Sequence, residues 1–323
     1  MKKLISIVLC ILILTAMLSG CGTAGSLTNA KKSVVVTIFP IYDWVINLLG
    51  DRAAEWNVTF LLDNGVDLHS YQPTAEDMIQ ISSCDLFIYV GGASDNWVND
   101  AIKGAVNPSQ QTVSLIEILG SDAKEEELVE GMEAEAEEEC EDREAELDEH
   151  VWLSLRNAER FCAEIVECLK ALDPDGTETY AANAQSYLAQ LQALDTRYTQ
   201  TVERAANRTL LFGDRFPFRY LTDDYGLDYY AAFVGCSAES EASFETVIFL
   251  AGKVDELSLP AIVALEGTKH DLASTILENT TKGTAQIVTM NSMQSTTRAD
   301  ADAGQSYLGI MEENLTALAL ALG

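Results

Sequence analysis

The chain has 323 residues, of which 48% are hydrophobic, so it can bury a sizeable core and is long enough for one large or two medium domains. Its formal net charge of -31 argues against a nucleic-acid-binding protein, because a phosphate backbone must be met by clusters of Lys and Arg. Attraction to cations is the direction that this charge permits.

The first residues have the layout of a secretory signal. Lys2 and Lys3 precede the apolar stretch 4–17, which is too short for a stable membrane span. The following Leu18-Ser19-Gly20-Cys21 resembles a bacterial lipobox, which implies cleavage before Cys21 and a diacylglycerol on its sulfur. The alternative is a plain signal peptide (1–21) with an incidental cysteine. Residues 22–32 are small and polar, as expected of a tether.

Five more cysteines follow, an odd number without a CxxC pair, so neither a zinc knuckle nor a full disulfide framework is indicated. Three of them lie in apolar surroundings and are expected to be buried thiols, namely Cys84, Cys162 and Cys236. Cys140 stands in a polar acidic stretch and is expected to be exposed.

Short apolar runs alternate with helical patterns over residues 33–120, which predicts a first α/β lobe with a parallel sheet. The segment Thr74-Ala75-Glu76-Asp77 has the layout of a capping box. Loops at the carboxyl ends of parallel strands form the ligand crevice, and His69 lies in such a loop, after the second strand. The strands are expected at 34–39, 58–62, 85–89 and 112–116, with helices at 44–50 and 93–103.

An acidic stretch occupies residues 121–149, with Arg143 the only base from Glu125 to Glu149. Like-charge repulsion predicts an extended or mobile loop. It is either a solvated linker or a loop that gathers cations weakly. Apolar structure resumes at His150-Val151-Trp152-Leu153, so the second histidine also stands at a boundary.

Residues 150–207 are expected to complete the first lobe and to form a long linking helix. Apolar residues at steps of three and four from Tyr180 to Val202 predict one rigid helix of roughly 35 Å. Residues 208–323 repeat the α/β pattern. The predicted fold is therefore α/β, with two lobes that each hold a mainly parallel sheet, joined by one long helix. The strands of the second lobe are expected at 209–212, 228–234, 261–265 and 286–290, and its helices at 243–257, 272–279 and 305–322.

The chain resembles a known family over nearly its whole length, and two segments carry the clearest motifs. Gly65 to Thr74 resembles the GVDPHSYEPT-type loop of ZnuA-like (cluster A-I) zinc and manganese substrate-binding lipoproteins of ABC importers. Asp148 to Leu153 is similar to the DPHVWL motif of that family, in the same order and after a charged loop. The resemblance implies that His69 and His150 are metal ligands, that the ion is Zn(II) or, second, Mn(II), and that an ABC permease is the partner.

The chemistry of these residues is consistent with that implication. Neutral imidazole binds borderline ions such as Zn(II), and a nearby carboxylate such as Asp67, Asp148 or Glu149 can fix the ring tautomer. Two nitrogens alone do not make a tight site.

The other ligand positions of the family are altered here. Aligning Tyr225-Gly226-Leu227 with the family's HDAFGYF-x3-YGL segment places Arg215 at the third ligand position, and a guanidinium cannot ligate a metal. Asp214 could do so if the strand end were shifted by one residue. The fourth position falls in Met290 to Ser295, where Asn291 and Gln294 offer neutral oxygens.

Two interpretations follow. In the first, His69 and His150 bind metal with water or with an oxygen of Asp214, Asn291 or Gln294, and Arg215 pairs with Glu266 or Glu241. In the second, the cleft holds another ligand, such as an anionic metal chelate gripped by Arg215. His270 is expected to be a surface residue.

Enzyme motifs are absent from the sequence, which has no GxSxG, HExxH, P-loop or strand-linked GxGxxG pattern. The aromatic residues Phe216, Phe218 and Tyr220 are expected to be packing residues. We therefore expect a monomeric, lipid-anchored extracytoplasmic binding protein without covalent chemistry. The alternative is an anchored adhesion or interaction lipoprotein with a vestigial metal site.

Overall fold

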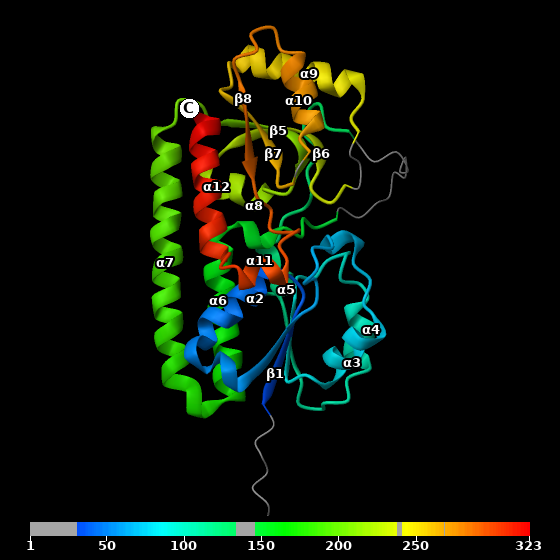
Figure 1. Ribbon diagram of the computed structural model, residues 1–323, viewed down its shortest axis with the longest axis vertical. Coiled ribbons are helices and arrows are strands. Elements are labelled where there is room, and N and C mark those ends of the chain that lie inside the picture. Colours follow the sequence, from blue (N-terminus) through cyan, green and yellow to red (C-terminus); the bar gives the residue numbers. More distant parts are fainter. Residues whose placement is uncertain (1–30, 134–145, 238–240, 268) are drawn as a thin grey trace, which may run out of the picture. The chain divides into compact units, whose positions relative to one another are not determined.

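The computed structural model describes residues 31–133, 146–237, 241–267 and 269–323 (Figure 1). The predicted signal peptide with Cys21, nearly all of the tether, and Cys140 lie outside these ranges. Residues 32–323 form one unit, which holds all of the helices and strands described below.

The first sheet is fully parallel and has the strand order β2-β1-β3-β4. Its central strand β1 buries Val34, Val35 and Val36 completely or almost completely, as a strand covered on both faces requires. The strands are β1 Lys32–Val36, β2 Trp56–Phe60, β3 Leu86–Tyr89 and β4 Gln111–Ser114, and the helices are α2 Phe39–Leu49, α3 Ala75–Ser83, α4 Val98–Lys103 and α5 Leu115–Leu119.

The capping box that the sequence predicts at Thr74 is confirmed, with the Thr74 and Asp77 side chains each bonded to the other residue's backbone N–H. Several predicted boundaries are wrong: the strand predicted at 112–116 ends at Ser114 and the one predicted at 209–212 extends to Phe216. Two further differences have a local cause. Strand β1 ends at Val36 because Pro40, in the first turn of α2, begins a helix earlier than expected. Helix α4 begins at Val98, since Gly91 and Gly92 have φ of 92° and 88° and turns occupy the residues before it.

The second sheet is also parallel, in the order β6-β5-β7-β8. The ring of Phe216 stacks on that of Tyr229 at 3.7 Å, and Phe218 and Tyr220 are buried, so the three aromatic residues serve packing. Helices α5, α8 and α11 were not predicted from the sequence. The strands are β5 Thr209–Phe216, β6 Asp228–Val234, β7 Ala261–Leu265 and β8 Gln286–Met290, and the helices are α8 Arg219–Tyr225, α9 Phe244–Leu257, α10 Asp271–Glu278 and α11 Arg298–Asp302.

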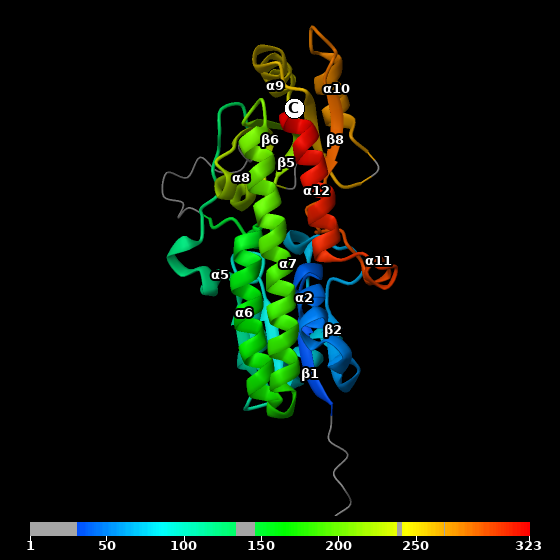
Figure 2. The same ribbon diagram turned by 90° about the vertical axis from the view of Figure 1, so that its left-hand side faces the viewer.

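Two helices connect the lobes. Helix α7 (Thr177–Arg204) has 28 residues, about 42 Å at 1.5 Å per residue, and packs on α6 (Leu155–Leu172), α2 and α12. Helix α12 (Tyr307–Leu322) contacts β7 and β8 of the second sheet and α2 of the first lobe. Figures 1 and 2 show α7 and α12 side by side. The α/β fold class is confirmed, and α12 adds a second connection to the predicted one.

The described ends of the acidic stretch are anchored to the body of the protein. Glu125 and Leu147 form an antiparallel bridge, and Glu133 pairs with Phe233 of β6. These ends lie against the body of the protein with few of their residues in regular structure, and residues 134–145 of the stretch lie outside the described part.

Candidate metal site

His69 lies in the short 3-10 turn Leu68–Ser70, in the connection that follows β2. The turn is capped by Asp67, whose Oδ1 accepts a hydrogen bond from the His69 N–H at 3.0 Å. The Nδ1 atom of the ring is 2.8 Å from Ser94 Oγ and 3.4 Å from Glu149 Oε2. These oxygens fix the ring and leave Nε2 directed toward the second histidine.

His150 is completely buried. Its backbone N–H and its Nδ1 both contact Asp148 Oδ1, at 2.8 and 3.1 Å. The following Trp152 donates from its indole nitrogen to Ser292 O at 2.8 Å, and its own carbonyl accepts from the Tyr307 hydroxyl at 2.7 Å. The His150 segment is thus tied to both lobes.

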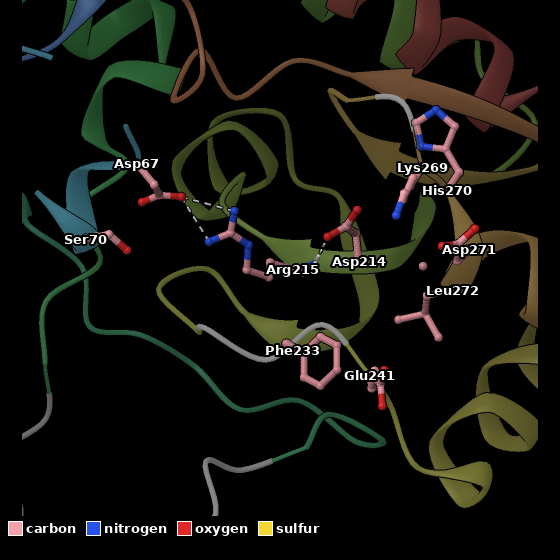
Figure 3. Close-up of a pocket in the computed structure, with 11 residues that line it drawn as sticks. Asp67, Ser70, Asp214, Arg215, Phe233, Glu241, Lys269, His270, Asp271 and Leu272 are labelled. Atoms are coloured by element: carbon pink, nitrogen blue, oxygen red, sulfur yellow. Dashed lines mark hydrogen bonds and ion pairs between the residues drawn. The ribbon is translucent and has the colours of Figure 1, made fainter. Parts of the chain in front are cut away.

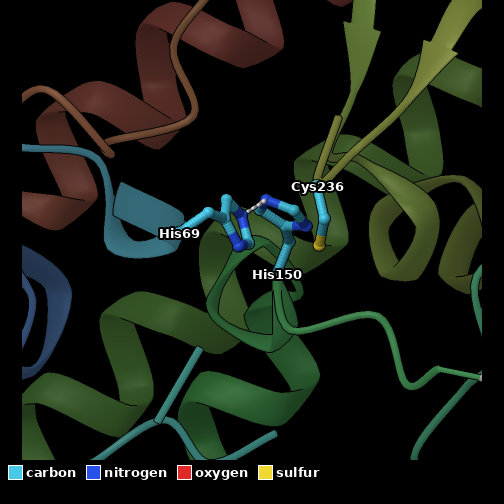
Figure 4. A group of neighbouring side chains, drawn as sticks. All are labelled: His69, His150 and Cys236. Carbon is cyan, nitrogen blue, oxygen red and sulfur yellow. Dashed lines mark hydrogen bonds between the residues drawn. The ribbon is translucent and has the colours of Figure 1, made fainter. Parts of the chain in front are cut away.

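The structure brings the two histidines together, with Nε2 of His69 and Nε2 of His150 3.3 Å apart (Figure 4). Two nitrogens that each lie about 2.0–2.1 Å from a tetrahedral ion are separated by about 3.3–3.4 Å. The observed separation therefore suits two ligands of one ion.

Gln294 reaches the same pair from the segment after β8. With its amide oriented to satisfy both neighbours, its nitrogen donates to both Asp67 carboxylate oxygens and its oxygen accepts from His150 Nε2, each at 2.9 Å. His69 Nε2 and Gln294 Oε1 thus converge on one atom, His150 Nε2. A divalent ion can take the place of the hydrogen that these contacts need.

The other two possible oxygen ligands, Asn291 and Asp214, form hydrogen bonds away from the histidine pair. Asn291 Oδ1 accepts from the Met293 N–H at 2.7 Å in a local turn. The oxygens of Asp214 accept from the backbone N–H groups of Arg215 and Leu265, at 2.9 and 3.2 Å. Within the described residues, neither side chain forms a hydrogen bond with His69 or His150.

The electrostatics of the pair favour positive charge. Burial disfavours the charged ring of His69, but the hydrogen bond with Glu149 and the charges of Asp67 and Glu149 outweigh it and raise the pKa of His69. Burial opposes ionisation of Glu149, yet hydrogen bonds from His69 and Ser94 lower the pKa of Glu149. A cation at this place meets Glu149 in its ionised form.

Arg215 pairs with Asp67, because both of its terminal nitrogens lie 3.2 Å from Asp67 Oδ2 (Figure 3). The expected pairing with Glu266 or Glu241 is wrong: Glu266 accepts instead from the N–H and the hydroxyl of Ser292, at 2.7 and 2.6 Å. The chain separation of these partners gave no hint of which carboxylate would be near.

A cavity of about 670 Å³ lies beside this ion pair (Figure 3). Asp214, Arg215 and His270 line it, together with Asp67. His270 is partly buried, and its Nε2 is 3.5 Å from Thr289 Oγ1. The third histidine therefore belongs to this cavity and is not part of the histidine pair.

Cys236 is the residue that the sequence analysis missed. Cys84 and Cys162 are buried as predicted, but Cys236 is only partly buried, and one ligand atom from each of His69, His150 and Cys236 lies within 4.8 Å of the others (Figure 4). Burial, reinforced by the charges of Glu126 and other carboxylates, raises the pKa of the Cys236 thiol. Its place two residues beyond β6, at a strand's carboxyl end, was the available signal.

Comparison with known proteins gives a consistent picture. Residues 34–321 match the family model described as "ZnuA: Zinc-uptake complex component A periplasmic". The zinc-binding lipoprotein AdcA of Streptococcus pneumoniae is 30% identical over 294 residues, which cover 90% of this chain and 56% of the relative. The high-affinity zinc uptake system protein ZnuA of Bacillus subtilis is 29% identical over 310 residues, which cover 94% and 92%.

Among solved structures, the Zn(II)-bound ZnuA-like domain of Streptococcus pneumoniae AdcA superposes with a TM-score of 0.70 at 27% identity, covering 91% of this chain and 99% of that domain. The chain spans about half the length of the AdcA relative. None of the described helices is long and apolar enough to cross a membrane. The match extends across both lobes and both histidine segments, and the chain belongs to the ZnuA family of zinc-uptake complex components.

Proposed function

We propose that this protein is the metal-binding component of an ABC importer. It captures Zn(II), with Mn(II) as the second candidate, outside the cytoplasm and delivers the ion to a membrane permease. The family match and the names of two relatives, a zinc-binding lipoprotein and a zinc uptake protein, support zinc as the cargo.

The observation that carries this proposal is the facing pair of imidazoles. An oxygen atom lies beside Nδ1 of each ring and can accept a hydrogen bond from a proton on it, which frees both Nε2 atoms to bind an ion. At their separation of 3.3 Å, one ion can replace the hydrogen that His150 Nε2 otherwise donates to Gln294 Oε1. We assign His69 Nε2 and His150 Nε2 as ligands, with Gln294 Oε1, 2.9 Å from His150 Nε2, as a candidate oxygen ligand beside them.

The route of release follows from the two connecting helices. Because α7 and α12 both pack against the two lobes, a wide hinge movement would have to break both helix contacts. Asp67 accepts from both Arg215 and Gln294, so it couples the His69 turn to the second lobe. We propose that the ion leaves when this loop contact rearranges, while the lobes move little.

Membrane anchoring is a separate part of the proposal. The Leu-Ser-Gly-Cys sequence and the lipoprotein name of the relative support a lipid on Cys21. We also propose that the protein acts as a monomer. Mass spectrometry of the protein from its native membrane tests the anchor, since a Cys21→Ser variant should lack the diacylglycerol mass.

Thermal unfolding with added Zn(II) tests the function. Ligand binding to the folded state stabilises it by about 2.7 kcal/mol when the ion is in hundredfold excess over the dissociation constant. His69→Ala together with His150→Ala should abolish the rise in melting temperature, and His270→Ala should retain it. A full shift in the double variant contradicts the site. No shift with Zn(II) or Mn(II) in the wild type would favour the adhesion alternative.

A further inference from the structure

We propose that Cys236 is a third metal ligand, so that the ion is held by two imidazole nitrogens and one thiolate. The inference rests on the proposed function, because it completes the site formed by His69 and His150. It also specifies the cargo, since sulfur selects thiophilic ions such as Zn(II) over Mn(II).

The backbone around the thiol is fixed. The Cys236 N–H donates to Glu126 Oε1 at 3.1 Å. The next residue, Ser237, donates from its N–H to Val234 O at 3.3 Å and accepts from Arg215 at 3.3 Å through its carbonyl. A turn held on both sides positions the cysteine beside the histidines.

The residue before it allows this close approach. A Cβ on Gly235 would lie 2.9 Å from His150 Cε1 and 3.0 Å from His150 Nδ1. Only a glycine lets the backbone pass so near the ring, and Cys236 follows directly. Close packing of this loop on the ring is a second observation, independent of the distance between the ligand atoms.

A cavity leads to the same place. It has a volume of about 250 Å³, and His69, Ser94, Glu149 and Cys236 are among its lining residues. The cysteine and one histidine therefore share a space that an ion and water can enter. Cys84 and Cys162, by contrast, are buried in the protein core.

The geometry is compatible with three ligands of one ion. One ligand atom from each of the three residues lies within 4.8 Å of the others, whereas N and S ligands of a tetrahedral zinc ion are about 3.6 Å apart, given bonds of about 2.0–2.1 and 2.3 Å. The sulfur would therefore move closer to the ring nitrogens, by at most about 1.2 Å, when it binds the ion.

The protons balance in a simple way. The Cys236 S–H bond breaks, its proton passes to water in the cavity, and a sulfur–metal bond forms without any change of oxidation state. The metal ion supplies the positive charge that a thiolate needs among the carboxylates of Asp148 and Glu149.

Cobalt substitution tests the inference on the full-length protein. Thiolate ligands give Co(II) a charge-transfer absorption in the near ultraviolet that imidazole and carboxylate ligands lack. We expect this absorption in the wild type and in the control variants Cys168→Ser and Cys140→Ser, and its loss in Cys236→Ser. The ratio of Zn(II) to Mn(II) affinity should fall at least tenfold in Cys236→Ser and stay unchanged in the controls.

Each outcome decides the matter. Wild-type protein that binds Co(II) without this absorption overturns the inference, even if Cys236→Ser cannot be purified. Absorption and selectivity that persist in Cys236→Ser overturn it as well. In both cases the proposed function stands if His69→Ala with His150→Ala abolishes Zn(II) binding. If the wild type binds neither Zn(II) nor Co(II), both proposals fall.

Discussion

Gly235→Ala should disturb the histidine pair through a single added methyl group. The new Cβ would lie 2.9 Å from the Phe216 carbonyl oxygen on one side and 2.9 Å from His150 Cε1 on the other. The first atom is backbone and the second belongs to a ring held by Asp148, so neither moves away freely. Overpacking of this kind costs about 1–3 kcal/mol of unfolding free energy.

The same methyl group should weaken zinc binding, because it displaces the ring that supplies a ligand. We expect a loss of about 10–100-fold, the range seen when a supporting partner of a metal ligand is removed. Urea unfolding measures the stability change, and competition with a chromophoric chelator measures the zinc affinity.

Gly252→Ala is the matched control. Gly252 lies inside α9, is exposed, and has no atom within 4 Å of an added Cβ. The identical chemical change should therefore stabilise the protein by about 0.5–1 kcal/mol, as helix propensity predicts, and leave zinc affinity unchanged. If Gly235→Ala unfolds at the wild-type urea concentration and binds zinc equally well, the close contact with His150 is refuted.

Two further predictions concern charged groups. Arg215→Met removes a positive charge near His69, so zinc affinity should rise, by less than about tenfold. The unfolding free energy should change by less than about 1 kcal/mol, because the ion pair of Arg215 with Asp67 is partly exposed. The control Arg197→Met breaks an exposed ion pair with Glu312 and should leave zinc affinity unchanged in the same chelator competition. Weakening of zinc binding by Arg215→Met would mean that the guanidinium supports the site. Burial raises the pKa of Asp43 to about 6, so the folded state holds this proton more tightly than the unfolded chain and the unfolding free energy should fall by roughly 2 kcal/mol as the pH rises from about 4 to about 6. Asp43→Asn should flatten that fall in urea unfolding measured across this pH range, and an unchanged profile would rule Asp43 out as its source.

Local patterns in the sequence predicted much of the fold, because they report on short-range physics. The buried run Val34 to Val36 and the capping box at Thr74 each depend on neighbours within a few residues. The two histidines could also be found, since each stands at a boundary flanked by family-like residues. Their separation of 3.3 Å could not be read from the chain, because it depends on how the segments pack.

Long-range pairings were beyond the sequence. Asp67 is the partner of Arg215, at a separation of 148 residues, and charge alone did not distinguish it from Glu266 or Glu241. The position of Cys236 just after β6 placed it at a strand's carboxyl end, but its proximity to His69 and His150 depends on how β6 and the His150 segment pack. The acidic stretch is another long-range case, since the bridge between Glu133 and Phe233 of β6 joins residues far apart in the sequence.

Helix α12 illustrates what periodicity omits. An apolar face predicts burial but does not name the partner, and the closing helix was assigned to the second lobe alone. In the structure the Tyr307 N–H donates to Asp43 Oδ2 at 3.1 Å and its ring lies 5.1 Å from that of Trp44, both in α2 of the first lobe. The second connection between the lobes follows from these contacts.

The most direct test of the site is X-ray absorption at the zinc K-edge of the zinc-loaded wild-type protein. With His69 and His150 as ligands, the spectrum should contain scattering from two imidazole rings at about 2.0–2.1 Å, together with one sulfur at about 2.3 Å if Cys236 also binds. A shell of oxygen atoms without imidazole scattering would contradict the assignment of the ion to the histidine pair.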